Sequence, residues 1–270
     1  MRSGVEAALA ATAHHGLEGV DPVVLQETNN TVVWLSPHLV VAKVSTSKLT
    51  AAGVIRDLEV CDYLASVDAP VRSPWGHAPI YSHELTGHVV TLWEYLPDSG
   101  TPITAATRAD SLKAVHRALH GYPRPLPSFR DALTAARGVL DDSERLAALA
   151  EPNRALLRSR FSAFMDQLDA TPLVVQPLHG EPHADNVLST PRGPRWIDFE
   201  AVATGPLEWD LAFLDDDTVA LFDTVDLGLL ALLRPLNSAR VATWCWARAH
   251  MPGMREHAEH HLEVVRRSTP

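Results

Sequence analysis

The chain has 270 residues, of which 46% are hydrophobic and 21% charged, and its formal net charge is −10. This length is enough for a sizeable core and for two lobes. The acidic balance argues against a nucleic-acid-binding protein, whose surface has to be basic to match phosphates, and it would suit a small cationic partner.

Cysteine content and hydropathy indicate the compartment. The two cysteines, Cys61 and Cys245, lie far apart, which excludes a disulfide framework and a cysteine-based zinc site. The alanine-rich N-terminus is interrupted by Glu6 and resembles a helix more than a secretory signal. The apolar run at 227–233 is far shorter than the ~20 residues of a membrane span. We expect a cytoplasmic protein without a membrane partner, and the sequence leaves the oligomeric state open.

The N-terminal part predicts a helix and a small sheet. A helix over residues 3–15 ends near Gly16, and β-rich runs follow at 23–26, 31–35 and 39–44. Turn residues separate these runs, which predicts a three-stranded antiparallel meander. Lys43 lies inside the third apolar run, so its ammonium group needs an anionic partner.

A further helix and two strands complete this region. Residues 49–65 have helical periodicity and carry Asp57 and Glu59. A proline-rich connection at 69–80 leads into strands around Ile80 and at 88–95, and Pro97 begins a turn-rich segment at 97–100. We therefore place a lobe boundary here, with an N-terminal lobe at 1–96 and a C-terminal lobe at 97–270.

The C-terminal region is mostly helical by periodicity. Helices are predicted at 105–120, 128–139 and 153–168, and again at 206–214, 225–233, 239–250 and 254–266. Strands followed by helices, with a hairpin inserted between the helices, predict the α+β class.

The stretch at 173–200 interrupts the helices and is the most informative part of the chain. Its pattern predicts strand, loop, strand, turn and strand, which could bring Glu181, Asn186 and Asp198 together. Two carboxylates and an amide suit Mg²⁺, which prefers oxygen ligands. The five-residue interval from Glu181 to Asn186, followed by Asp198, matches the spacing of a kinase catalytic loop and its second metal ligand. The stretch therefore predicts a phosphoryl-transfer site.

Three motifs in this region carry a family resemblance. HGEPHADN at 179–186, WIDFE at 196–200 and GPLEWDLA at 205–212 resemble, in this order, motifs of the aminoglycoside phosphotransferase and choline kinase superfamily. The resemblance implies a protein-kinase-like fold with a small antiparallel-sheet N-lobe and a mostly helical C-lobe. It also implies a small-molecule kinase that moves the γ-phosphate of a Mg²⁺-bound nucleotide to a hydroxyl group. The chain departs from the family at Glu181, where aspartate is usual.

The resemblance also assigns roles to individual residues. Glu181 would be the base, Asn186 and Asp198 would bind the metal, and Lys43 would bind phosphate with Asp57 as its partner. Glu59 is the reserve for that partner.

The resemblance also implies where the remaining nucleotide contacts lie. Asn29 and Asn30 occupy the turn that should cover the phosphates, although this turn has no glycine. Glu94 to Leu96 would form the hinge that reads the base through its backbone. ATP is the expected donor, and GTP stays open because side chains do not report such contacts.

The acceptor is a small hydroxylated molecule, for which an aminoglycoside or another amine is a candidate. His183, Asp215 and Trp244 are candidate acceptor contacts, because tryptophan faces and carboxylates attract cations. The competing interpretation is structural, since tryptophan is usually part of a core and acidic runs usually end helices.

Two other functions stay open. His179, Glu181, His183 and Asp185 alternate along the chain and could hold Zn²⁺ for hydrolysis, although Gly180 disfavours the extended strand that this requires. A catalytically silent nucleotide-binding regulator of the same fold is the other alternative. It is motivated by Glu181 and by the turn without glycine.

Overall fold

A computed structural model describes residues 2–27, 30–45, 48–76, 80–83 and 86–269. The chain forms two compact units, one made of residues 1–124 and 179–202, the other of residues 125–178 and 203–270. The stretch at 179–202 thus belongs to the unit that contains the N-terminal strands, although helices of the second unit precede and follow it in the sequence. The lobe boundary after residue 96 stays a prediction.

A five-stranded antiparallel sheet forms the body of the first unit. Its strands are β1 (Asp21–Glu27), β2 (Asn30–Ser36), β3 (Val40–Ser45), β4 (Ile80–Ser82) and β5 (Val89–Glu94), in the order β1-β2-β3-β5-β4. Strands β1 to β3 form the meander that the sequence predicts. The predicted α+β kinase-like fold, with an N-terminal sheet followed by a mostly helical region, is confirmed.

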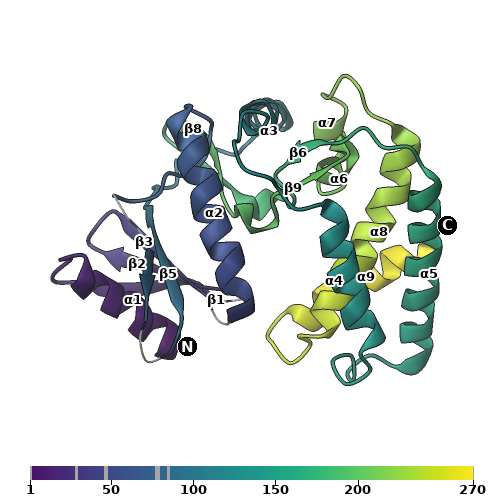
Figure 1. The fold of residues 1–270 in the computed structure, drawn as a ribbon, viewed down its shortest axis with the longest axis horizontal. Coiled ribbons are helices and arrows are strands. Elements are labelled where there is room, and N and C mark those ends of the chain that lie inside the picture. Colours follow the sequence, from purple (N-terminus) through teal and green to yellow (C-terminus); the bar gives the residue numbers. More distant parts are fainter. Residues whose placement is uncertain (1, 28–29, 46–47, 77–79, 84–85, 270) are drawn as a thin grey trace. The chain divides into compact units, whose positions relative to one another are not determined.

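Helices α1 (Arg2–His14) and α2 (Lys48–Ser66) cover opposite faces of this sheet (Figure 1). The alternation of side chains along β3 decides which residue meets which helix. Ala42 and Val44 point to one face, where they share an apolar cluster with Ala7 and Ala11 of α1. Lys43 therefore points to the other face, where α2 lies. The apolar run that surrounds Lys43 in the sequence thus packs largely away from its ammonium group.

A hairpin of β7 (Val187–Thr190) and β8 (Gly193–Trp196) completes the first unit, together with α3 (Ala105–Leu119). Trp196 is fully buried, and its Nε1 donates to Ser111 Oγ of α3 at 2.9 Å. Its backbone accepts a hydrogen bond from Arg72 N and donates one to Pro70 O. These contacts hold the end of β8 against the connection that precedes β4, and so fix where Asp198 emerges.

The second unit is mainly helical. It contains α4 (Phe129–Asp141), α5 (Glu151–Ala170), α6 (Leu207–Leu211), α7 (Asp216–Val219), α8 (Leu227–Trp246) and α9 (Met254–Arg267), with the strand pair β6 (Gln176–Leu178) and β9 (Ala203–Gly205). Apolar side chains of these elements form one core, which includes Phe161, Phe164, Trp209, Leu233 and Leu236. No helix among the described residues has both the length and the apolarity to cross a membrane.

Two predictions for this unit are wrong. The separate helices expected at 225–233 and 239–250 are one helix, α8, with Pro235 inside it. Leu233 and Leu236 on either side of the proline are fully buried, so packing outweighs the backbone hydrogen bond that proline removes. The strand predicted at the start of the stretch 173–200 is also placed too early. Strand β6 begins only at Gln176, and Val174 and Val175 before it are 90% and 61% exposed.

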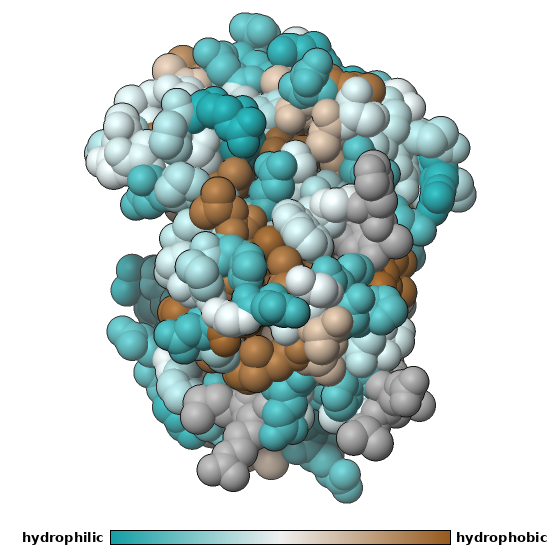
Figure 2. Space-filling model, turned by 90° about the vertical axis from the view of Figure 1, so that its left-hand side faces the viewer, coloured by the Kyte–Doolittle hydropathy of each residue, from teal (hydrophilic) through white to brown (hydrophobic). Residues whose placement is uncertain are grey.

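Apolar side chains also remain on the surface of the first unit. Val23, Val24 and Leu25 on the edge strand β1 are 40%, 42% and 50% exposed. Figure 2 shows a face of the molecule on which apolar residues lie between hydrophilic ones. Gln26 of the same strand lines the cavity described below. The exposed apolar residues therefore lie directly before a residue of the candidate site on β1.

Candidate functional site

A cavity of about 300 Å³ lies within the first unit and collects the predicted site residues. Its walls come from β1 to β3, the connection before β4, the loop at 179–186 and the segment after β8. The lining residues are Gln26, Asn30, Val32, Lys43, Arg72, Glu181, His183, Asp185, Asn186, Ile197, Asp198 and Glu200. Segments far apart in the sequence thus meet at one polar cavity.

Lys43 is the centre of the charge network in this cavity. Its side chain is buried, and its Nζ lies 2.7 Å from Asp57 Oδ2, 2.9 Å from Asp198 Oδ1 and 2.6 Å from Glu200 Oε1. Burial alone would lower the pKa of Lys43, but the three carboxylates together raise it above its ordinary value. Lys43 is therefore protonated at neutral pH and holds three acids close together.

Asp57 of α2 is the acid that is fully buried in this network. Its Oδ1 accepts a hydrogen bond from the backbone N–H of Phe199 at 2.8 Å, and its Oδ2 receives Lys43. Glu59, the reserve candidate, instead pairs with Arg124 at 2.7 Å on the surface. The structure thus brings Asp57, and not Glu59, to Lys43.

The loop at 179–186 is held by contacts to its own backbone and to the segment after β8. The His179 ring lies 3.1 Å from Ile197 O through Nε2 and packs on Phe199, with ring centroids 4.3 Å apart. Asn186 Nδ2 donates to Glu181 O at 2.9 Å, and Asn186 O accepts from Ile197 N. The nitrogen of the Asn186 side-chain amide is therefore fixed within the loop, which sets the orientation of this side chain.

Gly180 allows this loop to pass close to its neighbours. Its φ is +95°, and a Cβ placed on it would lie 1.9 Å from Ala201 O. Any side chain here would meet backbone and would also require a backbone conformation that favours glycine. The absence of a side chain at Gly180 thus allows the loop before Glu181 to pack closely against the segment that follows Asp198.

We expect Gly180→Ala to destabilise the protein by several kcal/mol, roughly 3 or more, and to displace Glu181. Gly193→Ala is the matched control, because Gly193 also has a positive φ of 89° but nothing lies within 4 Å of its added Cβ. That control should lose only the stability that the backbone strain costs, roughly 1–2 kcal/mol. Urea unfolding of both variants measures the difference, and equal losses would contradict a steric role for Gly180.

Asp198 and Glu200 supply the remaining acids of the site. Burial would raise the pKa of Asp198, but the nearby Lys43 ammonium holds it below its usual value. Burial together with the charge of Asp198 raises the pKa of Glu200, against the opposing effect of Lys43. Asp198 is therefore ionised at neutral pH, as a metal ligand has to be.

The described residues contain one cluster of acids or imidazoles that could hold a metal ion, made of Asp57, Asp198 and Glu200 with ligand atoms within 4.8 Å of one another. All of its donors are carboxylate oxygens, which fit Mg²⁺ better than Zn²⁺. The alternating set that begins at His179 is not part of this cluster, and its His183 Nδ1 lies 3.8 Å from Asp185 Oδ2. Lys43 Nζ lies within 2.9 Å of an oxygen of each of these three acids, so the same carboxylates form the ion-pair network described above.

Comparisons with known proteins identify the family of the chain. A model of the phosphotransferase enzyme family, APH, matches residues 23–252 of the sequence. The chain belongs to this family. No curated protein sequence matches the chain.

Solved structures of similar proteins show the same fold as this APH-family chain. The GDP and kanamycin complex of APH(2")-IIia has a TM-score of 0.71 at 16% identity and covers 98% of both chains. Amicoumacin kinase in complex with AMP-PNP and Ca²⁺ has a TM-score of 0.74 at 11% identity, covering 100% of this chain and 97% of the kinase. A choline kinase from Streptococcus pneumoniae has a TM-score of 0.67 at 13% identity, covering 97% and 99%.

The predicted nucleotide-covering turn of this phosphotransferase is only partly described. Asn29 lies outside the described residues. Asn30 is buried, and its Nδ2 donates to Glu200 Oε1 at 2.6 Å. Its amide is therefore engaged with an acid of the site. The assignment of both residues to phosphate binding stays a prediction.

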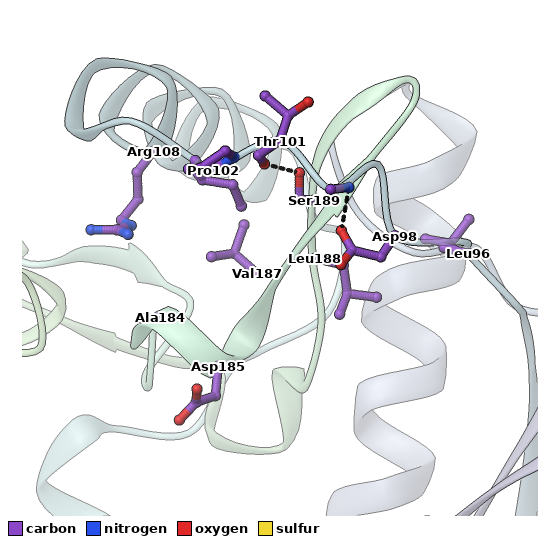
Figure 3. A pocket seen from close by; sticks show the side chains of 12 residues that line it. Leu96, Asp98, Thr101, Pro102, Arg108, Ala184, Asp185, Val187, Leu188 and Ser189 are labelled. Atoms are coloured by element: carbon purple, nitrogen blue, oxygen red, sulfur yellow. Dashed lines mark hydrogen bonds between the residues drawn. The ribbon is translucent and has the colours of Figure 1, made fainter. Parts of the chain in front are cut away.

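The predicted hinge borders a second cavity of about 610 Å³. Leu96 lines it together with Asp98, residues 100–103, Arg108 of α3 and residues of β7, and Figure 3 shows Val187 and Leu188 below this segment. Ser189 Oγ donates to Thr101 O, which ties the segment after the hinge to β7. Glu94 itself donates its backbone N–H to Ser73 O. Its role and that of Leu96 in base recognition stay predictions.

The candidate acceptor residues occupy different places. His183 lines the first cavity. Asp215, in the second unit, accepts a hydrogen bond from Thr218 N and so caps α7. The guanidinium groups of Arg145 and Arg248 lie 5.4 and 5.5 Å from the ring of Trp244. Asp215 and Trp244 thus have local structural roles, and acceptor binding by any of the three stays a prediction.

Sequence reasoning missed Arg72. It lies in the proline-rich connection, where an arginine would ordinarily be expected on the surface. The structure buries it to 8% exposure, places it in the lining of the first cavity and sets its guanidinium 4.9 Å from the ring centroid of Trp93. The alternation of apolar residues gives no signal for this burial, because the connection is not a regular strand.

Proposed function

We propose that the protein is a small-molecule O-phosphotransferase that moves the γ-phosphate of a Mg²⁺-bound nucleoside triphosphate to a hydroxyl of a small acceptor. One observation carries this proposal: Lys43 Nζ lies 2.9 Å from Asp198 Oδ1 in a cavity that Glu181 and Asn186 also line. Phosphoryl transfer requires mainly positioning and neutralisation of charge. An ammonium group, a carboxylate and an amide in one cavity meet both needs.

Each residue has a distinct task in this proposal. Lys43, fixed by Asp57, binds the α- and β-phosphates, and Asn186 and Asp198 bind the metal. Magnesium neutralises charge on the phosphates when it is bound. Glu181 orients the acceptor hydroxyl and accepts its proton. The side chain of Glu181 is longer than that of the usual aspartate, which moves the carboxylate by about one bond length. The hydrogen bond from Asn186 Nδ2 to Glu181 O fixes the backbone from which this side chain extends.

The donor and acceptor are proposed more broadly. Similar structures hold GDP in one case and AMP-PNP in another, so ATP is the first donor to test and GTP the second. The titles of similar proteins mention kanamycin, amicoumacin kinase and choline kinase. Together with a net charge of −10, they favour an aminated and hydroxylated acceptor.

The test is Glu181→Gln, assayed by release of nucleoside diphosphate with aminoglycosides, choline-like amines and sugars. We expect transfer to fall by about 10²–10⁴-fold, since the amide cannot accept the proton, while nucleotide affinity is unchanged. Glu181→Asp is the matched control and should retain transfer, because it keeps the carboxylate and restores the family's usual residue. Unchanged turnover in Glu181→Gln would remove Glu181 from the base role.

The second candidate is a nucleotide-binding regulator without catalysis, which the glutamate at position 181 motivates. It predicts that the wild-type protein binds nucleotide but releases no diphosphate with any acceptor or with water. Turnover in the wild type that disappears in Asp198→Ala would exclude this alternative, because the same metal ligand would then serve a reaction.

A further inference from the structure

Arg72 is a charged residue that the proposed mechanism does not use. It is 8% exposed, and no hydrogen bond or ion pair joins its guanidinium to any residue in the described ranges. Its Nε is wholly buried without an acceptor. Burying a charge without a hydrogen-bonding partner is costly, so the burial of Arg72 requires a structural or functional reason.

The contact with Trp93 does not satisfy Arg72. The guanidinium carbon lies 4.9 Å from the indole centroid, and the attraction of a cation to a ring face is not a hydrogen bond. A guanidinium has five N–H donors, which such a contact does not satisfy. Trp93 therefore holds the orientation of Arg72 and leaves its donors to bind something else.

The neighbouring acids influence Arg72 without binding it. Burial lowers the pKa of Arg72, whereas the charges of Asp57 and Asp198 raise it. Both carboxylates are already bound by Lys43, at 2.7 and 2.9 Å. Arg72 is thus a second cation near acids that Lys43 already binds, and it lines the same cavity as Asn186 and Asp198.

We propose that Arg72 binds an oxygen of the phosphate chain of the donor nucleotide, as a second phosphate-binding cation in the same cavity as Lys43. This inference rests on the proposed function, and it adds a contact from the connection before β4. A guanidinium matches a phosphate with two parallel N–H donors, which an ammonium cannot provide. The hydrogen bond between Arg72 N and Trp196 O holds the backbone of this residue next to the end of β8, two residues before Asp198.

The experiment measures affinities of the full-length protein for ATP, ADP, adenosine and inorganic tripolyphosphate, with Mg²⁺ and without an acceptor. In Arg72→Gln we expect the affinity for ATP and tripolyphosphate to fall about 10- to 100-fold, while that for adenosine is unchanged. The affinity of Arg72→Lys for ATP should lie between that of the wild type and that of Arg72→Gln. Arg124→Gln is the control, because Arg124 is exposed and pairs with Glu59, and it should match the wild type.

Several outcomes would overturn the inference. An Arg72→Gln protein with wild-type ATP affinity, or one that loses adenosine and ATP affinity equally, would make Arg72 a structural support for Trp93. Should Arg72→Gln fail to fold, the ratio of ATP to adenosine affinity in Arg72→Lys decides in the same way. A wild type that binds no nucleotide would overturn the proposed function as well. A wild type that binds ATP but transfers no phosphate leaves this test intact.

Discussion

Replacement of Asp57 by alanine is expected to lower the free energy of unfolding by about 3–5 kcal/mol, the usual cost of breaking a buried ion pair. Asp57 is fully buried, and its two carboxylate oxygens bind Lys43 Nζ and the backbone N–H of Phe199. Alanine leaves the Phe199 N–H without its acceptor and removes one of the anions that compensate Lys43. Because Phe199 directly follows Asp198, the variant should also lose the position of Asp198, the proposed metal ligand.

Glu59→Ala is the matched control for this experiment. Glu59 lies on the same helix, two residues later, and carries the same charge, but its partner Arg124 is 60% exposed. Exposed pairs contribute little, so we expect a change of at most ~1 kcal/mol. Denaturant unfolding of the two variants gives the comparison. Equal effects would mean that the pair between Lys43 and Asp57 does not hold the first unit together.

Lys43→Met is expected to abolish transfer and to turn the network into a divalent-cation site. Loss of a positioned donor to the phosphates should lower transfer by about 10²–10³-fold or more. The oxygens of Asp57, Asp198 and Glu200 lie within 4.8 Å of one another, and methionine removes the cation between them. Mg²⁺ or Ca²⁺ alone should then raise the melting temperature of the variant more than that of the wild type.

The pH dependence of Lys43→Met should differ from the wild type as well. Without the ammonium, burial and the repulsion between Asp198 and Glu200 raise the pKa values of these two acids in the folded state above their unfolded values. The folded state then binds more protons than the unfolded state, so stability should rise as the pH is lowered from 7 towards 5. Lys113→Met, a substitution of a lysine on α3 outside the cavity lining, is the control. Melting curves at both pH values without this relative gain would contradict the predicted repulsion.

Much of the fold could be predicted from the sequence because its signals are local. The β-rich runs at 23–26, 31–35 and 39–44 and the turn residues between them predicted the meander β1 to β3. The loop and hairpin that carry Glu181, Asn186 and Asp198 could be predicted as well, since a five-residue interval and a short hairpin depend on near neighbours in the chain. Turn chemistry at Gly193 was sufficient to place the reversal between β7 and β8.

Other features could not be predicted because distant packing decides them. Helical periodicity predicted separate helices at 225–233 and 239–250, but fully buried residues on both sides of Pro235 keep α8 continuous. Asp57 and Glu59 are two residues apart, which on a helix turns them by about 200° and places them on opposite faces. Which of the two meets Lys43 depends on how α2 lies on the sheet. Arg72 gave no signal, since its burial comes from Trp93 and from the end of β8.

The sequence by itself determined the chemical groups of this protein and their local spacing: a lysine in a buried strand, and an acid, an amide and a second acid around a hairpin. Only the tertiary structure decided which of them share a cavity, because Lys43 is 14 residues from Asp57 and 155 residues from Asp198. The physical reason is that burial and charge compensation act between atoms that are close in space. A buried ammonium requires nearby anions, and the folded chain, not the order of residues, brings those anions to it.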